Sequence, residues 1–180
     1  MKKHKYKRSC AGFYRLRNLL VMLLLVCVLA LALKLVNGLP DVSSGFEAAT
    51  VSYVVDGDTL YVDTDSGRTK VRLIGIDTPE SVSETKENTP EGKAAAEYVR
   101  TLLHPGDMVY LAYDEQKSDK YGRTLAYVWL KADADSGSYE DFCRYNLSAV
   151  IYQNTFCSLM SIPPNTAYKA WLESLTPYES

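Results

Sequence analysis

Three short runs of apolar and β-branched residues follow one another between residues 48 and 74. They occupy residues 48–55, 60–63 and 69–74, and polar turn residues separate them. Asp56-Gly57 lies between the first two runs, and Asp-Gly is a strong signal for a tight hairpin turn. The segment is therefore predicted to form an antiparallel meander of three strands, because short strands joined by tight turns pair with their sequence neighbours.

A helix and further strands are predicted after the meander. Thr89 and Pro90 are typical of the N-cap and first position of a helix, and residues 93–103 continue it with apolar residues at helical spacing. The other predicted elements are two strands and two short helices, at residues 108–113, 124–130, 139–145 and 166–175. Because an open sheet of five short strands would leave costly edges, a closed sheet is favoured. The predicted fold class is α+β: a five-stranded OB-fold-type β-barrel with three helices.

The N-terminus has the composition of a membrane-targeting segment. Residues 1–18 carry seven Lys and Arg, and the run at residues 19–33 has no charge. Such a basic flank stays in the cytoplasm, so the remainder of the chain is predicted to lie outside. The run is long for a signal-peptide core and shorter than the roughly 20 residues that span a bilayer. A retained transmembrane anchor, extending to residue 36, and a cleaved signal peptide both remain open, with the anchor favoured.

Residues 39–180 are acidic, with 12 Lys and Arg against 22 Asp and Glu and a net charge of −10. Because nucleic-acid binders normally present a basic face, this balance argues against tight non-specific binding of a polyanion, although a small basic site remains compatible with it. Cys143 and Cys157 lie in this part of the chain. They pair in an oxidising compartment or remain two separate buried thiols, and their spacing does not decide between the two.

Six polar side chains in three short strings form the candidate site: Asp58, Arg72, Asp77, Thr78, Glu80 and Arg123. Asp58 follows a turn and Asp77 ends a strand, so neighbouring strands can direct both carboxylates into one space. Hard oxygen ligands of this kind suit Ca²⁺ or Mg²⁺. Carboxylates combined with guanidinium groups are typical of metal-assisted phosphodiester hydrolysis. Taken singly, each string is also an ordinary turn sequence.

In their order and spacing the three strings resemble the staphylococcal nuclease (thermonuclease, micrococcal nuclease) family. They read Val-Asp-Gly-Asp-Thr from residue 55, Arg-Leu-Ile-Gly-Ile-Asp-Thr-Pro-Glu from residue 72 and Asp-Lys-Tyr-Gly-Arg from residue 119. The resemblance covers about residues 48–151. It implies that Ca²⁺ is bound by the side chains of Asp58 and Asp77 and by the main-chain carbonyl of Thr78.

The same resemblance implies three catalytic residues. Arg72 and Arg123 would hold the scissile phosphate, and Glu80 would orient or deprotonate the attacking water. Three substrate-binding residues are also implied: Lys120 and Tyr121 match residues near the terminal phosphate of the nucleotide, and Tyr152 matches an aromatic residue beside the base.

A segment and a single residue depart from the family pattern. Residues 81–88 hold one lysine and two glutamates where the family is rich in lysine, which weakens the expected capture of substrate. Asn146 stands where glycine is usual, and we expect it to adopt the left-handed conformation at the end of a helix.

The resemblance thus implies a calcium-dependent, monomeric nuclease that cleaves DNA and RNA with low sequence specificity, prefers single strands and leaves 3′-phosphate ends, and the N-terminal segment predicts that it is extracytoplasmic. It would be attached to the cell membrane with the nuclease domain outside, or secreted if the N-terminal segment is cleaved. The predicted domains are a basic region at 1–18, the anchor or signal core at 19–36, a linker at 37–47 and a nuclease-like domain at 48–180. The alternative is a catalytically weak or inactive module that binds nucleic acid or protein at the cell surface.

Overall fold

The computed structural model describes Asn18, Val21, Met22 and residues 45–80 and 89–179. The chain divides into two compact units, Met1–Asp41 and Val42–Ser180, of which the second holds the fold discussed below. Within the described residues, no helix has the length and apolar character needed to cross a membrane. The predicted anchor or signal core at residues 19–36 lies, apart from Val21 and Met22, outside the described residues.

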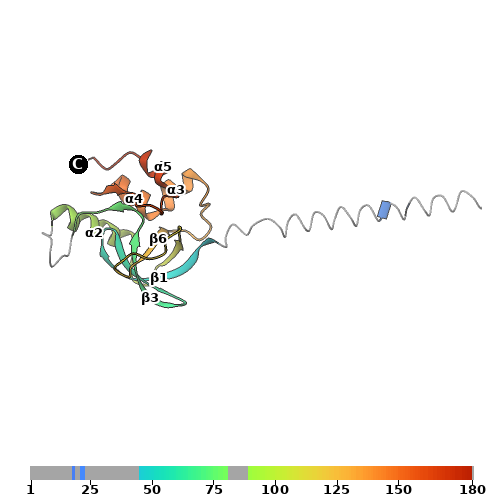
Figure 1. Cartoon of the computed structure of the whole chain (residues 1–180), viewed down its shortest axis with the longest axis horizontal. Helices are drawn as coiled ribbons and strands as arrows, with labels where there is room; N and C mark the ends of the chain where they lie inside the picture. Colours follow the sequence, from blue (N-terminus) through green and yellow to red (C-terminus); the bar gives the residue numbers. More distant parts are fainter. Residues whose placement is uncertain (1–17, 19–20, 23–44, 81–88, 180) are drawn as a thin grey trace, which may run out of the picture. The chain divides into compact units, whose positions relative to one another are not determined.

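Five strands close into a barrel in the order β1-β2-β3-β6-β5 (Figure 1). Their bounds are Glu47–Asp56 for β1, Thr59–Thr64 for β2, Gly67–Leu73 for β3, Met108–Ala112 for β5 and Thr124–Trp129 for β6. The first three strands form the predicted antiparallel meander, while β3 pairs with β6 in parallel and so closes the barrel. The predicted α+β class and the five-stranded barrel are confirmed.

Helices and a small second sheet surround the barrel. The sheet joins β4 (Gly75–Asp77) to β7 (Ser158–Met160) in antiparallel pairing. The helices are α2 (Pro90–Leu102), α3 (Tyr139–Tyr145), α4 (Leu147–Asn154) and α5 (Lys169–Glu173). As predicted, Thr89 caps α2, and its side chain accepts a hydrogen bond from the Gly92 N–H.

The prediction of three helices is wrong, because the described part of residues 42–180 contains four. Asn146 is the physical reason. It has extended φ and ψ angles of −78° and 119°, not the expected left-handed conformation, so it ends α3 abruptly. Its side chain then accepts hydrogen bonds from the N–H groups of Ser148 and Ala149 and starts α4 at once.

The alternation of side chains along β3 places one functional residue. Val71 and Leu73 are buried in the barrel core, where they meet residues such as Leu60 and Val62 of β2. Because successive side chains of a strand point to opposite faces, Arg72 is directed out of the barrel. Arg72 is nevertheless only 5% exposed, so its charge must be compensated by neighbouring groups.

Gly75 redirects the chain from the barrel toward the candidate site. Its φ of 95° lies in the region that favours glycine, and it connects the end of β3 to β4. Leu172 of α5 packs so closely against Gly75 that a Cβ atom at position 75 would overlap the leucine side chain. The path of the chain from β3 to Asp77 therefore depends on a residue without a side chain.

We expect Gly75→Ala to destabilise the fold by roughly 2–4 kcal/mol, because the substitution combines backbone strain with overpacking. Gly67→Ala is the matched control, since Gly67 has a φ of 114° but a Cβ atom there would meet nothing within 4 Å. It should cost only the backbone strain, roughly 1 kcal/mol. Urea unfolding measures both values, and equal losses would contradict the steric role of Leu172.

Candidate active site

A cavity of about 280 Å³ opens beside the ends of β1 and β3. The residues that line it are Asp56, Asp58, Thr59, Arg72, Asp77, Glu80, Tyr121, Arg123 and Met160. Five of the six predicted site residues are among them. The sixth, Thr78, is buried and contacts Asp58 directly. Segments that are far apart in the sequence therefore bring their polar side chains into one space.

Arg72 joins the two predicted metal-binding carboxylates. Its Nη1 lies 2.5 Å from Oδ2 of Asp58, and its Nη2 lies 2.6 Å from Oδ1 of Asp77. The side chains of Arg72 and Asp58 are 7% and 9% exposed, whereas that of Asp77 is 52% exposed. One guanidinium group thus neutralises a buried carboxylate and holds a more exposed one beside it.

Asp58 is fixed by hydrogen bonds to both of its carboxylate oxygens. Thr59 Oγ1 donates to Oδ1 over 2.8 Å, and the N–H and Oγ1 of Thr78 donate to Oδ2 over 2.9 and 3.0 Å. Gly57 makes this approach possible, because a Cβ atom there would lie 2.8 Å from Cγ2 of Thr78. The Asp-Gly-Asp string therefore supplies a hairpin turn and a space for Thr78.

Glu80 is positioned by the first turn of α2. Its main-chain carbonyl accepts a hydrogen bond from the Thr89 N–H over 3.1 Å, which ties Glu80 to the N-cap of α2. Gly92 packs directly against the carbonyl groups of Pro79 and Glu80, and a Cβ at position 92 would overlap them. The helix and the glutamate segment are thus in backbone contact.

Arg123 is held by Asp119, a residue that was not predicted to belong to the site. Its Nε donates to Oδ2 of Asp119 over 2.6 Å, and Oδ1 accepts from the N–H groups of Tyr121 and Arg123. Burial raises the pKa of Asp119, but the hydrogen bonds from Arg123 and Tyr121 outweigh it and bring that pKa below its usual value. Gly122, with a φ of 77°, completes the turn. The sequence did hold a signal for Asp119, because an aspartate often begins a tight turn and this one stands shortly before the candidate site residue Arg123.

A second cavity of about 380 Å³ adjoins the first and shares Arg72, Tyr121, Arg123 and Met160 with it. Two predicted substrate-binding residues, Lys120 and Tyr121, line this cavity, as do the apolar side chains of Ile162 and Pro163. The apolar lining was not predicted. The segment after Asn154 has no periodic pattern of apolar residues from which the direction of its side chains could be inferred.

Tyr152, the third predicted substrate residue, lines neither of these cavities. It is partly buried against both apolar clusters of the core, and its carbonyl accepts a hydrogen bond from the Tyr178 N–H. Its contact with a base stays a prediction.

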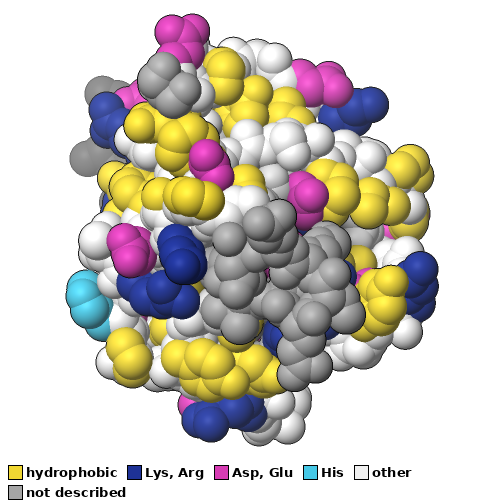
Figure 2. All heavy atoms as spheres, turned by 90° about the vertical axis from the view of Figure 1, so that its left-hand side faces the viewer, with side chains coloured by type: hydrophobic (Ala, Val, Ile, Leu, Met, Phe, Trp, Pro, Cys, Tyr) yellow, Lys and Arg dark blue, Asp and Glu magenta, His cyan; other side chains and the backbone are white. Residues whose placement is uncertain are grey.

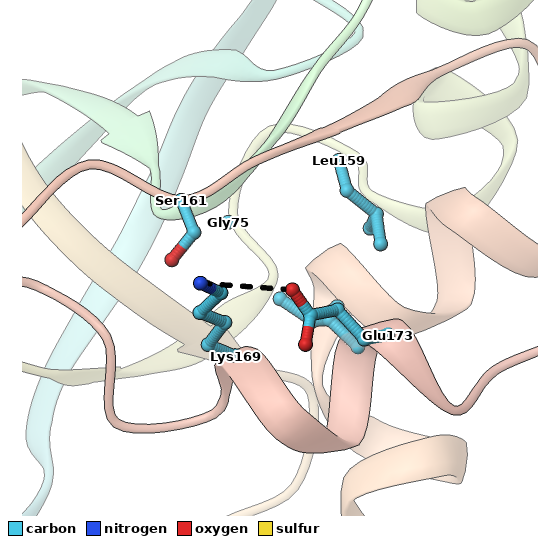
Figure 3. Close-up of a pocket in the computed structure, with 6 residues that line it drawn as sticks. Gly75, Leu159, Ser161, Lys169 and Glu173 are labelled. Atoms are coloured by element: carbon cyan, nitrogen blue, oxygen red, sulfur yellow. Dashed lines mark ion pairs between the residues drawn. The ribbon is translucent and has the colours of Figure 1, made fainter.

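A third cavity, of about 230 Å³, lies beside the β4–β7 sheet and α5 and is lined by none of the predicted site residues. In Figure 3 Lys169 and Glu173 of α5 lie next to each other as an ion pair, with Gly75, Leu159 and Ser161 around them. The two charged groups form an ion pair of 3.7 Å, so the cavity presents no uncompensated charge from them.

The described residues that line the first cavity carry more negative than positive charge. Four of them are carboxylates and two are guanidinium groups. Among the described residues there is no group of three or more His, Cys, Asp or Glu placed to hold a metal. Oxygen ligands without histidine or cysteine do not suit Zn²⁺, whereas a hard divalent cation would balance the excess charge and accept carboxylate and carbonyl ligands. The donor set therefore fits a hard divalent cation.

Comparison with known proteins agrees with this site. A family model described as staphylococcal nuclease homologue matches residues 70–157, which include every predicted site residue except Asp58. The chain is 42% identical over 115 residues to the thermonuclease of Staphylococcus intermedius, covering 61% of this chain and 68% of that protein. The chain belongs to the staphylococcal nuclease family. The resemblance seen in the three sequence strings is thereby confirmed.

Two further relatives extend this result. The thermonuclease of Staphylococcus hyicus is 39% identical to this nuclease-family chain over 118 residues, covering 63% of this chain and 69% of the relative. Endonuclease YhcR of Bacillus subtilis is 35% identical over 95 residues, covering 49% of this chain and 8% of that protein. In the latter case the similarity concerns one region of a much longer protein.

Cys157 lies close enough to the site to be affected by its charge. Burial, and then the negative charges of Asp58 and Asp77, raise the pKa of this thiol to about 12. Cys143 and Cys157 are both free thiols in the structure, which favours separate thiols over a disulfide, although both are partly rather than fully buried.

We expect Arg72→Met to destabilise the metal-free protein by about 3 kcal/mol or more, because Asp58 would remain buried without its cation. Arg68→Met is the matched control on the same strand. Arg68 pairs with Asp63, but both side chains are largely exposed, at 58% and 45%, so its loss should leave stability nearly unchanged. Urea unfolding in chelator compares the variants, and similar midpoints would contradict the structural role of the Arg72 pairs.

We expect Cys157 in the folded protein to be alkylated by iodoacetamide at pH 8 far more slowly than in urea, because its raised pKa leaves almost no thiolate. Peptide mapping by mass spectrometry separates Cys157 from the other cysteines.

The raised pKa also makes the free energy of unfolding depend on pH. The protonated Cys157 thiol contributes its full share to this free energy below the ordinary thiol pKa of about 8.5. That share is lost as the pH rises toward 12. Rapid labelling of the folded protein at pH 8 would contradict the assignment.

Proposed function

We propose that this chain is a Ca²⁺-dependent nuclease that hydrolyses phosphodiester bonds of DNA and RNA with low sequence specificity. The observation that supports this proposal best is the first cavity, in which Arg72, Arg123 and Glu80 converge with three aspartates. Membership of the family and similarity to two thermonucleases point the same way.

Asp58 and Asp77 are the residues that would hold Ca²⁺, together with the main-chain carbonyl of Thr78. The two carboxylates already converge, since a single arginine contacts both. When bound, Ca²⁺ would act as a Lewis acid and neutralise charge on the phosphate oxygens. Ca²⁺ tolerates irregular geometry and mixed carboxylate, carbonyl and water ligands, so water molecules would complete a site that starts from two aspartates and one main-chain carbonyl.

The remaining residues of the cavity perform the proposed reaction. Arg72 and Arg123 donate hydrogen bonds to the non-bridging oxygens of the phosphate and stabilise the charge that develops there. Glu80 orients a water molecule for attack on phosphorus in line with the leaving oxygen and accepts its proton. Asp119 keeps the guanidinium of Arg123 at the cavity wall through the 2.6 Å ion pair. Cleavage of the bond between phosphorus and the 5′ oxygen leaves a 3′-phosphate end.

The second cavity supports binding of the nucleotide beside the scissile phosphate. Lys120 reaches toward a terminal phosphate, while Tyr121, Met160 and Ile162 offer apolar surface to a base. Contacts to phosphate and to the face of a base carry little sequence information, which accounts for low specificity. A base must be unstacked to enter, so single strands of DNA or RNA are the preferred substrates.

We also propose the domain boundaries and the location given by the sequence. Residues 1–18 and 19–36 act as a basic cytoplasmic region and an anchor or signal core, and residues 37–47 link them to the nuclease domain at 48–180. The nuclease domain then works outside the cell membrane, or is secreted after cleavage, and acts as a monomer. The basic flank and apolar run of the N-terminus support this proposal.

The alternative is a module that binds nucleic acid or protein without hydrolysis, and the acidic charge of the domain favours only its protein-binding form. The net charge of −10 over residues 39–180 weakens long-range attraction of a polyanion. On the face of the molecule in Figure 2, basic side chains form small separate groups among acidic and hydrophobic ones. Retention of all six site residues favours the enzyme.

The test compares hydrolysis of single-stranded DNA in Ca²⁺ and in chelator. We expect wild-type protein to cleave only with Ca²⁺, and Glu80→Gln and Arg123→Met each to lower kcat by about 10²-fold or more. Glu91→Gln, an exposed carboxylate in the first turn of α2, is the matched control and should retain activity. Absence of cleavage by folded wild-type protein in Ca²⁺ would overturn the proposal in favour of the binding module.

A further inference from the structure

Two tyrosines stack on the outer surface of the barrel, outside the cavities described above. Tyr53 of β1 and Tyr61 of β2 are direct partners across the strands, with ring centroids 4.8 Å apart and an interplanar angle of 26°. Tyr53 is 47% exposed, although large aromatic side chains usually bury more of their surface. The pair therefore presents a fixed aromatic surface to solvent.

A lysine lies beside the tyrosine pair. Lys70 of β3 is the strand partner of Tyr61, and its Nζ is 5.8 Å from the centroid of the Tyr61 ring. Among the described residues Lys70 forms no ion pair, whereas Arg68 on the same strand is held by Asp63. The charge of Lys70 is thus available to an anion, next to an aromatic ring.

This surface lies next to the first cavity in the strand register. Lys70 and Arg72 lie two positions apart on the same face of β3, roughly 7 Å along the strand. Tyr61 and Thr59 have the same relation on β2, and Thr59 is the strand partner of Arg72. Because Thr59 and Arg72 line the first cavity, a chain that leaves the scissile phosphate along these strands meets Lys70 and Tyr61 next.

The electrostatics of the domain make such a contact useful. Residues 39–180 carry a net charge of −10, and carboxylates outnumber guanidinium groups in the first cavity. Long-range attraction therefore contributes little to holding a nucleic acid, whereas stacking of a base on an aromatic ring does not depend on net charge.

We propose that Tyr53, Tyr61 and Lys70 form a second subsite for single-stranded nucleic acid. It takes a base on the tyrosine pair and a phosphate on Lys70, at a nucleotide beyond the cleaved bond. The subsite rests on the proposed nuclease function and extends it, since it makes substrate capture depend on the length of the strand. A purely structural role, as a cross-strand aromatic pair that stabilises the hairpin, predicts no such dependence.

Binding is measured first, by fluorescence anisotropy of a labelled thymidylate decamer and a labelled thymidine dinucleotide, using the full chain in chelator to prevent cleavage. Tyr53→Thr and Lys70→Met should each weaken binding of the decamer about fivefold or more and leave the dinucleotide unaffected. Tyr53→Phe keeps the aromatic ring and should bind like wild type. Lys131→Met is the matched control, because Lys131 lies 5.1 Å from the ring of Tyr145 in a similar contact but outside this surface.

Steady-state hydrolysis in Ca²⁺ then separates the subsite from the function. The variants should raise KM for the decamer and leave its kcat, and the cleavage of the dinucleotide, at the wild-type level. If wild type binds the decamer more tightly than Tyr53→Thr does but cleaves neither substrate, the nuclease proposal fails and the subsite stands. If Tyr53→Thr and Lys70→Met bind the decamer like wild type while their urea midpoints fall, the tyrosine pair is structural and the subsite is overturned.

Discussion

The contact of Arg72 with Asp58 and Asp77 is the interaction on which the rest of the site depends. A buried guanidinium group needs a compensating anion, and a buried carboxylate needs a cation, so each requires the other in the folded protein. The ion pair of Arg72 with Asp58 holds the hairpin between β1 and β2 against the end of β3. The ion pair of Arg72 with Asp77 holds β4 beside the same end of β3. The chemistry of the site and the closure of this corner of the barrel therefore share the same groups.

Much of the barrel and most of the site were accessible from the sequence. Alternation and turn residues located the five strands, because a half-buried strand repeats every two residues and Asp-Gly fixes a hairpin. The six candidate site residues were identified because the order and spacing of their three strings resemble a known family, and their roles stay a prediction. Neither signal required knowledge of which strands are neighbours in space.

Features that depend on three-dimensional neighbours were missed. The break between α3 and α4 at Asn146 could not be predicted. An asparagine can end a helix or cap the start of one, and which of these it does depends on its contacts in the folded protein. Asp119 looked like a turn residue, and its ion pair with Arg123 depends on the fold of the loop. The stacking of Tyr53 on Tyr61 required the register of β1 and β2, which a bulge shifts between Val51 and Tyr53.

The parallel pairing of β3 with β6 has a consequence for when the candidate site is assembled. It aligns Arg72 with Leu125, so Arg72 and Arg123 reach one cavity although 51 positions separate them in the sequence. No local segment contains the complete constellation, and a chain that has formed only its meander has one of the two arginines in place. The candidate site is therefore complete only once β6 has joined the barrel, and a chain that has formed its meander alone carries no assembled site.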